Sequence, residues 1–144
     1  MSRHSFLLVL ILNLALTACA SQSTVDLFNA VEIGDLTIAS QALANQADIN
    51  FARFSRRPLP IPVPVPPCNH DKGETPLSLA ALTGNEAMVT LLIEKGANLD
   101  EPPNCTPLVM AVVANKPDIA RILLAKGARV SLAALNVAVS VNRS

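Results

Sequence analysis

The sequence is poor in the residues on which nucleic-acid binding depends. It contains no Trp or Tyr and only four Phe, and its formal net charge is zero over 144 residues. A protein of this composition lacks the aromatic platforms on which bases stack and the excess of cations that neutralises phosphates. We therefore expect no nucleic-acid partner.

Groups suited to catalysis are equally scarce. Of the two histidines, His4 lies in the N-terminal segment described below, which leaves His70 for the rest of the chain. The sequence also has no Gly-rich phosphate-binding loop, no His-Glu-x-x-His pair and no Gly-x-Ser-x-Gly turn. Because catalysis needs titratable side chains that converge in one pocket, we predict that the protein is not an enzyme and carries neither a cofactor nor a metal.

Long hydrophobic runs are absent except at the N-terminus. The apolar stretch of residues 6–18 is 13 residues long and follows Arg3 and His4. A helix needs about 20 residues to span a bilayer, so this stretch is too short for a permanent transmembrane anchor. A basic start, a short apolar run and small residues at its end are typical of a signal peptide, and we predict that residues 1–18 form one.

The end of this run resembles a bacterial lipobox. The sequence Leu16-Thr17-Ala18-Cys19 implies cleavage before Cys19 and attachment of acyl chains such as palmitate, with residues 19–24 as a lipidated tether. Two or more acyl chains hold a protein stably on a membrane. Ala20 is not the Asp that favours the inner membrane in enterobacterial lipoproteins, so the resemblance implies the outer membrane, facing the periplasm. The alternative is an ordinary secretory signal, which would leave Cys19 as a reactive thiol.

The remaining chain contains a repeat. Residues 73–97 and residues 104–128 share Thr-Pro-Leu-x-x-Ala near their starts and Lys-Gly-Ala at their ends. The two capping threonines, Thr75 and Thr106, lie 31 positions apart. A repeat of this length predicts stacked units, because one unit cannot bury its apolar side alone.

Two weaker copies flank this pair. An earlier copy runs from Leu27 to Asn50, and its offset of 50 positions implies a 19-residue insertion before the second copy. We place the start of a fourth, truncated copy at Leu135, which leaves no room for a second helix before Ser144. The sequence thus predicts about three complete repeats and a C-terminal half repeat.

The pattern resembles the ankyrin repeat, in which Thr-Pro-Leu-His-x-Ala-Ala-x-x-Gly precedes a helix with paired leucines and then Gly-Ala-Asp. The resemblance covers residues 25–143, with Ser78 and Val109 in place of the histidine and Asn115 in place of a glycine. It implies an all-α fold, an ankyrin-repeat solenoid of about three helix pairs plus the half repeat, over a domain of residues 25–144. Asn adopts the left-handed backbone more readily than most residues, so it can replace that glycine.

Local signals agree with helical pairs. Thr75 and Thr106 are good N-caps, and the proline after each takes the first helical position, where an N–H is not needed. The apolar residues of segment 88–92 have helical spacing, and Gly96 predicts the end of that helix. Acidic residues near the starts of second helices favour the positive end of the helix dipole; these are Asp35, Glu86 and Asp118.

The insertion, residues 51–72, has an unusual composition. Six prolines between Pro58 and Pro67 disfavour helix and central strand and favour an extended, semi-rigid arm, which we expect to protrude. Before the prolines lies the only concentrated basic and aromatic patch of the mature chain, and such residues are common at binding hot spots. The alternative is a solvated, tolerated loop. The candidate partner-binding residues are Phe51, Arg53, Phe54, Arg56 and Arg57.

The cysteines admit three interpretations. If Cys19 is acylated, Cys68 and Cys105 remain in an oxidising compartment, each before a Thr-Pro helix start. We predict a disulfide between them. A metal site formed by Cys68, His70 and Cys105 would have only three ligands without paired spacing, and free thiols are the remaining alternative.

The functional prediction follows from the architecture. Ankyrin families hold other proteins on a concave surface made of fingers and first helices. The resemblance therefore implies a monomeric, lipid-anchored protein that binds a protein partner in the bacterial envelope through this surface and the Pro-rich finger. Two alternatives remain open: an immunity protein that neutralises a toxin acting in the periplasm, which would be encoded beside that toxin, and a purely structural envelope component.

Overall fold

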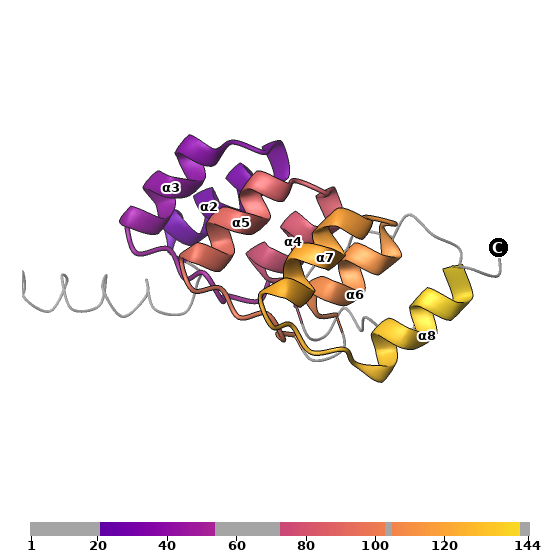
Figure 1. Cartoon of the computed structure of the whole chain (residues 1–144). Coiled ribbons are helices and arrows are strands. Elements are labelled where there is room, and N and C mark those ends of the chain that lie inside the picture. The colour runs from indigo at the N-terminus through magenta and orange to yellow at the C-terminus, as the bar shows by residue number, and fades with distance from the viewer. Residues whose placement is uncertain (1–20, 54–72, 103–104, 142–144) are drawn as a thin grey trace, which may run out of the picture.

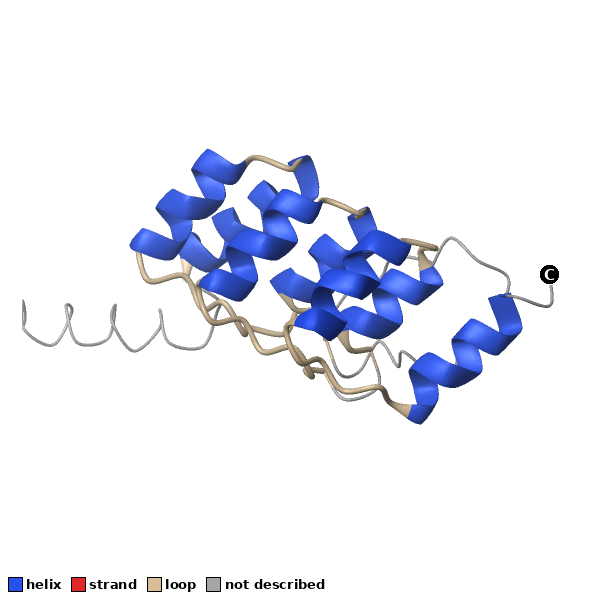
Figure 2. Cartoon of the chain, in the orientation of Figure 1, coloured by secondary structure: helices blue, strands red, loops and turns tan. Residues whose placement is uncertain are grey.

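The computed structural model describes residues 21–53, 73–102 and 105–141, and these fold into helices joined by short loops (Figures 1 and 2). Successive helices pair into three helical hairpins that stack side by side, and one further helix lies at the C-terminal end of the stack (Figure 1). The predicted all-α solenoid of about three helix pairs with a terminal half repeat is confirmed. The helices are α2 (Gln22–Ile33), α3 (Leu36–Ala44), α4 (Pro76–Thr83), α5 (Glu86–Glu94), α6 (Pro107–Val113), α7 (Pro117–Ala125) and α8 (Leu132–Val141).

The stack has two layers. Helices α2, α4, α6 and α8 pack in that order in the inner layer, and α3, α5 and α7 pack in the outer layer. The core lies between the layers and includes Leu77 and Leu79 of α4 and Leu92 of α5, each no more than 1% exposed. Every residue of segments 76–81 and 107–111 is buried. The first turns of the two central inner helices are therefore buried all round, whereas Thr83 at the end of α4 is exposed.

Polar caps start the central inner helices, as the sequence predicts. The Thr75 hydroxyl accepts from the backbone N–H of Ser78 at 3.3 Å, and the Thr106 hydroxyl accepts from that of Val109 at 3.3 Å. The Ser78 hydroxyl accepts from the Thr75 N–H at 2.9 Å, which completes a capping box. Ser78 is 1% exposed. The replacement of the motif's histidine thus preserves a fully hydrogen-bonded helix start in the second repeat.

The turns between paired helices require the left-handed backbone. Gly84 has φ 82° and Asn115 has φ 53° at the equivalent turn, so the predicted substitution of glycine by Asn is confirmed. A Cβ atom at Gly84 would lie 2.6 Å from Cε of Lys116 in the next repeat. Gly84 is thus needed for its backbone conformation, and a side chain there would also displace the flexible end of the Lys116 side chain.

The two terminal helices begin earlier than the sequence predicts. Helix α2 begins at Gln22, three residues ahead of the expected domain start, because the Ser21 hydroxyl caps it by accepting from Thr24 N–H at 3.2 Å. Helix α8 begins at Leu132, three residues ahead of the expected Leu135. The Ser131 hydroxyl accepts from Ala134 N–H at 3.2 Å there. In both cases a serine supplies a helix start that the repeat motif does not mark.

Candidate functional site

The base of the Pro-rich insertion is closed by a pair of residues on its two sides. The backbone N–H of Arg53 donates to the carbonyl of Glu74 at 3.0 Å, and the N–H of Glu74 donates back at 2.6 Å. This is an isolated antiparallel bridge. The chain therefore leaves the first repeat and enters the second at the same place.

The side chain of Arg53 reinforces this bridge. Its Nε and Nη2 atoms lie 3.3 and 3.2 Å from Oε2 of Glu74, and Nη2 also donates to Oε1 of Glu32. The guanidinium lies over the ring of Phe28, 4.2 Å from its centroid, in a cation–π contact. Phe28 in turn meets Phe51 edge to face at 6.5 Å. Arg53 thus joins the first repeat to the second at the positions where the chain enters and leaves the insertion.

These contacts occupy two of the five residues expected to bind a partner. Arg53 has 27% of its side chain exposed, and Phe51 is half-buried against the core. Both have a clear role inside the domain, and partner binding by them stays a prediction. Phe54, Arg56 and Arg57 lie outside the described residues.

Sequence reasoning missed the partners of Arg53. Glu32 and Glu74 lie 21 positions before and after it, beyond the reach of any local pattern. The sequence contains one indication of the role of Glu74: this residue directly precedes the cap Thr75 and so lies beside the end of the insertion. Glu74 is only 7% exposed, and a buried carboxylate needs a cation.

The finger loops are fastened to one another by a recurring set of hydrogen bonds. The carboxamide of Asn50 accepts from Asn98 N–H of the next repeat at 2.8 Å. One repeat further, the carboxylate of Asp100 accepts from Arg129 N–H at 2.9 Å, and the Arg129 guanidinium lies 3.5 Å from the same carboxylate. These bonds fix the spacing between fingers independently of the helical core.

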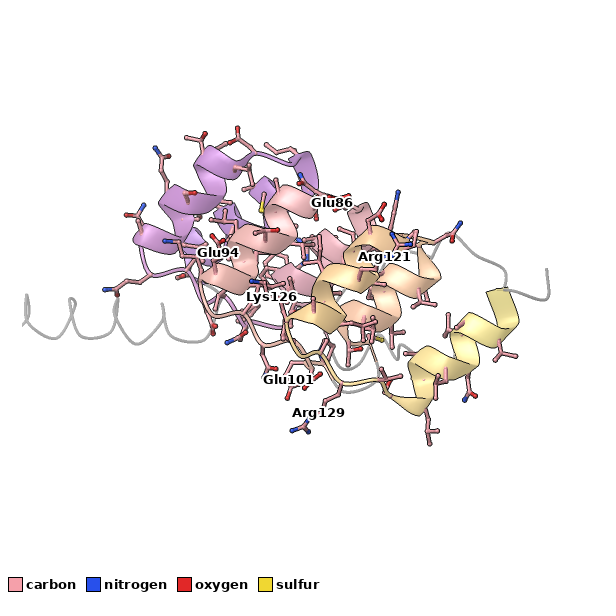
Figure 3. The ribbon with its side chains drawn as sticks, in the orientation of Figure 1. Glu86, Glu94, Glu101, Arg121, Lys126 and Arg129 are labelled. Carbon is pink, nitrogen blue, oxygen red and sulfur yellow. The ribbon has the colours of Figure 1, made fainter. Side chains whose placement is uncertain are left out.

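Exposed charges lie on two sides of the stack. Figure 3 shows Glu101 and Arg129 projecting from the finger loops, whereas Glu86 and Glu94 of α5 and Arg121 of α7 lie on the outer helices. Most of α4 and α6 is buried, so these two inner helices offer few side chains to a ligand. The inner helices at the ends of the stack do expose apolar side chains, such as Ile33 of α2 and Leu135 of α8. Recognition by the described residues must therefore use the fingers, the outer helices or the ends of the stack.

The cysteine and membrane predictions fall mostly outside the described residues. Cys105 is buried, and its N–H donates to the carbonyl of Pro102 at 3.1 Å, directly before the Thr106 cap. Cys19, Cys68 and His70 lie outside the described ranges. Within those ranges no three potential metal ligands cluster. None of the described helices combines the length and the hydrophobicity needed to cross a bilayer.

Helix pairs that share caps, turns and interlocking fingers define a repeat protein of stacked helical hairpins. The profile of the family described as ankyrin repeats (3 copies) matches residues 27–134, so the chain belongs to the ankyrin-repeat family. It is 42% identical over 67 residues to "Ankyrin repeat and SAM domain-containing protein 6" of Mus musculus and 40% identical over 67 residues to the Rattus norvegicus protein. Each match covers 44% of this chain but only 8% of the relative.

Proposed function

We propose that this ankyrin-repeat protein is a non-catalytic binding module that holds another protein in the bacterial envelope. The family consists typically of interaction scaffolds without enzymatic activity. The observation that carries the proposal is the fastening of finger to finger through Asn50 and Asp100. Fingers held at fixed spacing lose little conformational entropy when a partner binds, which favours recognition of a folded protein surface.

The envelope location rests on the N-terminal sequence. Leu16-Thr17-Ala18-Cys19 supports cleavage before Cys19 and acylation of its thiol. We test this by expressing the full chain in a bacterium and measuring the mass of the product by mass spectrometry. The expected product begins at Cys19, carries acyl chains and sediments with membranes, whereas a Cys19→Ser variant does not. A wild-type product that retains residue 1 would contradict the location.

Partner binding is tested by affinity capture with the lipid-free chain from Ala20 onward. We expect saturable capture of one envelope protein. A double variant, Arg56→Glu with Arg57→Glu, should weaken capture if the finger contributes. The matched control is Arg53→Lys, which keeps the charge at the base of the insertion. Loss of binding in this control but not in the double variant would assign the effect to domain stability.

The same capture experiment separates binding from a purely structural role. A structural component held by lipid and packing alone would capture no protein at any concentration of the lipid-free chain. Circular dichroism must show that the variants that capture a partner and those that do not have the same helix content. Absence of capture by a chain that has the helix content of the folded protein contradicts the proposed function.

A further inference from the structure

The outer helices α5 and α7 differ in how much of one face is buried. In α5, Val89 is fully buried and Ile93 is half-buried, with α7 as the next outer helix. The equivalent residues of α7, 31 positions later, are Ala120, which is half-buried, and Leu124, which is 46% exposed. The surface of α7 that corresponds to a helix-packing surface in α5 therefore lies open.

This open surface is one wall of a groove. The groove has a volume of about 590 Å³. Ala120, Arg121 and Leu124 of α7 line one side, and Ala138 of α8 lies opposite. No described helix follows α8 to occupy this position beside α7 (Figure 1). The groove thus lies beside α7 in the position that α7 itself occupies beside α5.

In the earlier repeats, the turn between paired helices lies beside the N-cap of the next outer helix. The first turn, at Gly34, is met by Asn85, the N-cap of α5; the second, at Gly84, is met by Lys116, the N-cap of α7. The third turn, at Asn115, lines the groove. A helix seated in the groove would by this relationship begin beside Asn115 and run in the same direction as α7.

The charges around the groove select the kind of helix. Two cations, Lys116 and Arg121, line the groove, and no carboxylate does. The nearby carboxylate of Asp118 pairs with Arg121 at 2.7 Å. The lining of the groove is therefore electropositive and favours an acidic ligand.

We propose that the groove between α7 and α8 binds an acidic amphipathic helix of a partner protein, in the place of a further outer helix. Its length should match the 9 residues of α5 and of α7. Its apolar face would cover Ala120, Leu124 and Ala138, and its carboxylates would lie near Lys116 and Arg121. This inference rests on the proposed function, because it presupposes protein binding, and it assigns that binding a surface and a ligand class.

The test uses a defined peptide as the probe. A fluorescently labelled peptide with the sequence of residues 85–97 and Lys95→Glu is acidic and has the apolar spacing of an outer helix. We expect saturable binding to the full chain by fluorescence polarisation, weakening as salt is raised. A control peptide with Glu86→Lys and Glu94→Lys keeps the apolar face and should bind at least tenfold more weakly. Equal binding of both peptides, or none, overturns the proposal.

Variants of the protein locate the binding. Leu124→Asp should weaken acidic-peptide binding at least tenfold, because it places a carboxylate in the groove. Leu132→Asp is the matched control: Leu132 is 79% exposed and does not line the groove, so binding should persist. Equal loss in both variants, with helix content unchanged, overturns the assignment to the groove.

Two further outcomes separate this inference from others. Concentration-dependent self-association, measured by analytical ultracentrifugation and abolished by Leu124→Asp, would assign the groove to a second copy of the chain and overturn the partner-helix proposal. If affinity capture of an envelope protein succeeds and is unaffected by Leu124→Asp, the proposed function stands while the groove proposal fails. Failure of capture together with specific peptide binding would overturn the envelope function alone.

Discussion

Arg53 and Glu74 are joined twice, through a reciprocal pair of backbone hydrogen bonds and through guanidinium–carboxylate contacts at 3.2 and 3.3 Å. They bracket a segment of 20 residues, so the pair ties the insertion to the core at both of its ends. The Glu74 carboxylate is only 7% exposed. A buried carboxylate of this kind depends on its cation, which makes Arg53 a stability element of the domain.

Replacing Arg53 should therefore destabilise the fold. Arg53→Ala leaves the Glu74 carboxylate buried without its cation and removes the contact with the Phe28 ring. We expect the free energy of unfolding to fall by about 1–3 kcal/mol, as measured by urea denaturation followed by circular dichroism. Arg53→Lys keeps the charge but loses the bidentate geometry, and should give a smaller loss.

The control for this prediction is an exposed ion pair elsewhere in the chain. Arg121 and Asp118 lie 2.7 Å apart, but their side chains are 77% and 64% exposed. Arg121→Ala should change the free energy of unfolding by less than about 0.5 kcal/mol. If Arg121→Ala and Arg53→Ala have equal effects, the pairing at the base of the insertion contributes no more to the free energy of unfolding than an exposed ion pair does.

Gly84 provides a test of the packing between repeats. Gly84→Ala forces a side chain into the left-handed region, at a cost of about 1–2 kcal/mol, and brings its Cβ against the Lys116 side chain. Gly96→Ala imposes the same kind of backbone strain with no atom within 4 Å of the new Cβ. We expect Gly84→Ala to lower the melting temperature more than Gly96→Ala does.

The Lys116 contact can be isolated in a double variant. Adding Lys116→Ala to Gly84→Ala should restore part of the lost stability, because it removes the atoms 2.6 Å from the new Cβ. Lys116→Ala should restore no stability when it is combined with Gly96→Ala. Additive effects in both combinations would show that the Lys116 side chain moves away from the new Cβ without a measurable cost.

The proposed Cys68–Cys105 disulfide has a stability signature. A cross-link between these positions would stabilise the fold by about 3–4 kcal/mol in the chain-entropy description. We expect Cys68→Ser, Cys105→Ser and the reduced wild-type protein to lose similar amounts of unfolding free energy. Rapid alkylation of both thiols in the unfolded, unreduced protein, detected by mass spectrometry, would contradict the pairing.

Much of the fold could be predicted because it is local. The caps Thr75 and Thr106, the left-handed Asn115 and the acidic residue at the start of α5, Glu86, all act within one helix turn, where the sequence motif is informative. The constant offset between the repeats then predicted that the helix pairs stack on one another. The early start of α8 was missed because the motif continues without a marked threonine, and Ser131 supplies the cap.

The candidate site was harder to predict because it depends on pairing between distant segments. Nothing near Arg53 in the sequence indicates that Glu32 and Glu74 converge on it, so its basic and aromatic surroundings indicated a binding patch. The groove beside Leu124 was also missed. Its openness depends on the absence of a further described helix beside α7, whereas the apolar spacing of α7 matches that of the covered helix α5.

The central claim is that the described helices form one preorganised stack, and hydrogen–deuterium exchange of the unliganded chain tests it most directly. The amides of α4 and α6 should exchange slowest, because most residues of these two helices are buried. Those at the exposed start of α8 should exchange faster. Rapid exchange throughout α4 and α6 would contradict the account, since it would mean that the stack does not form without a partner.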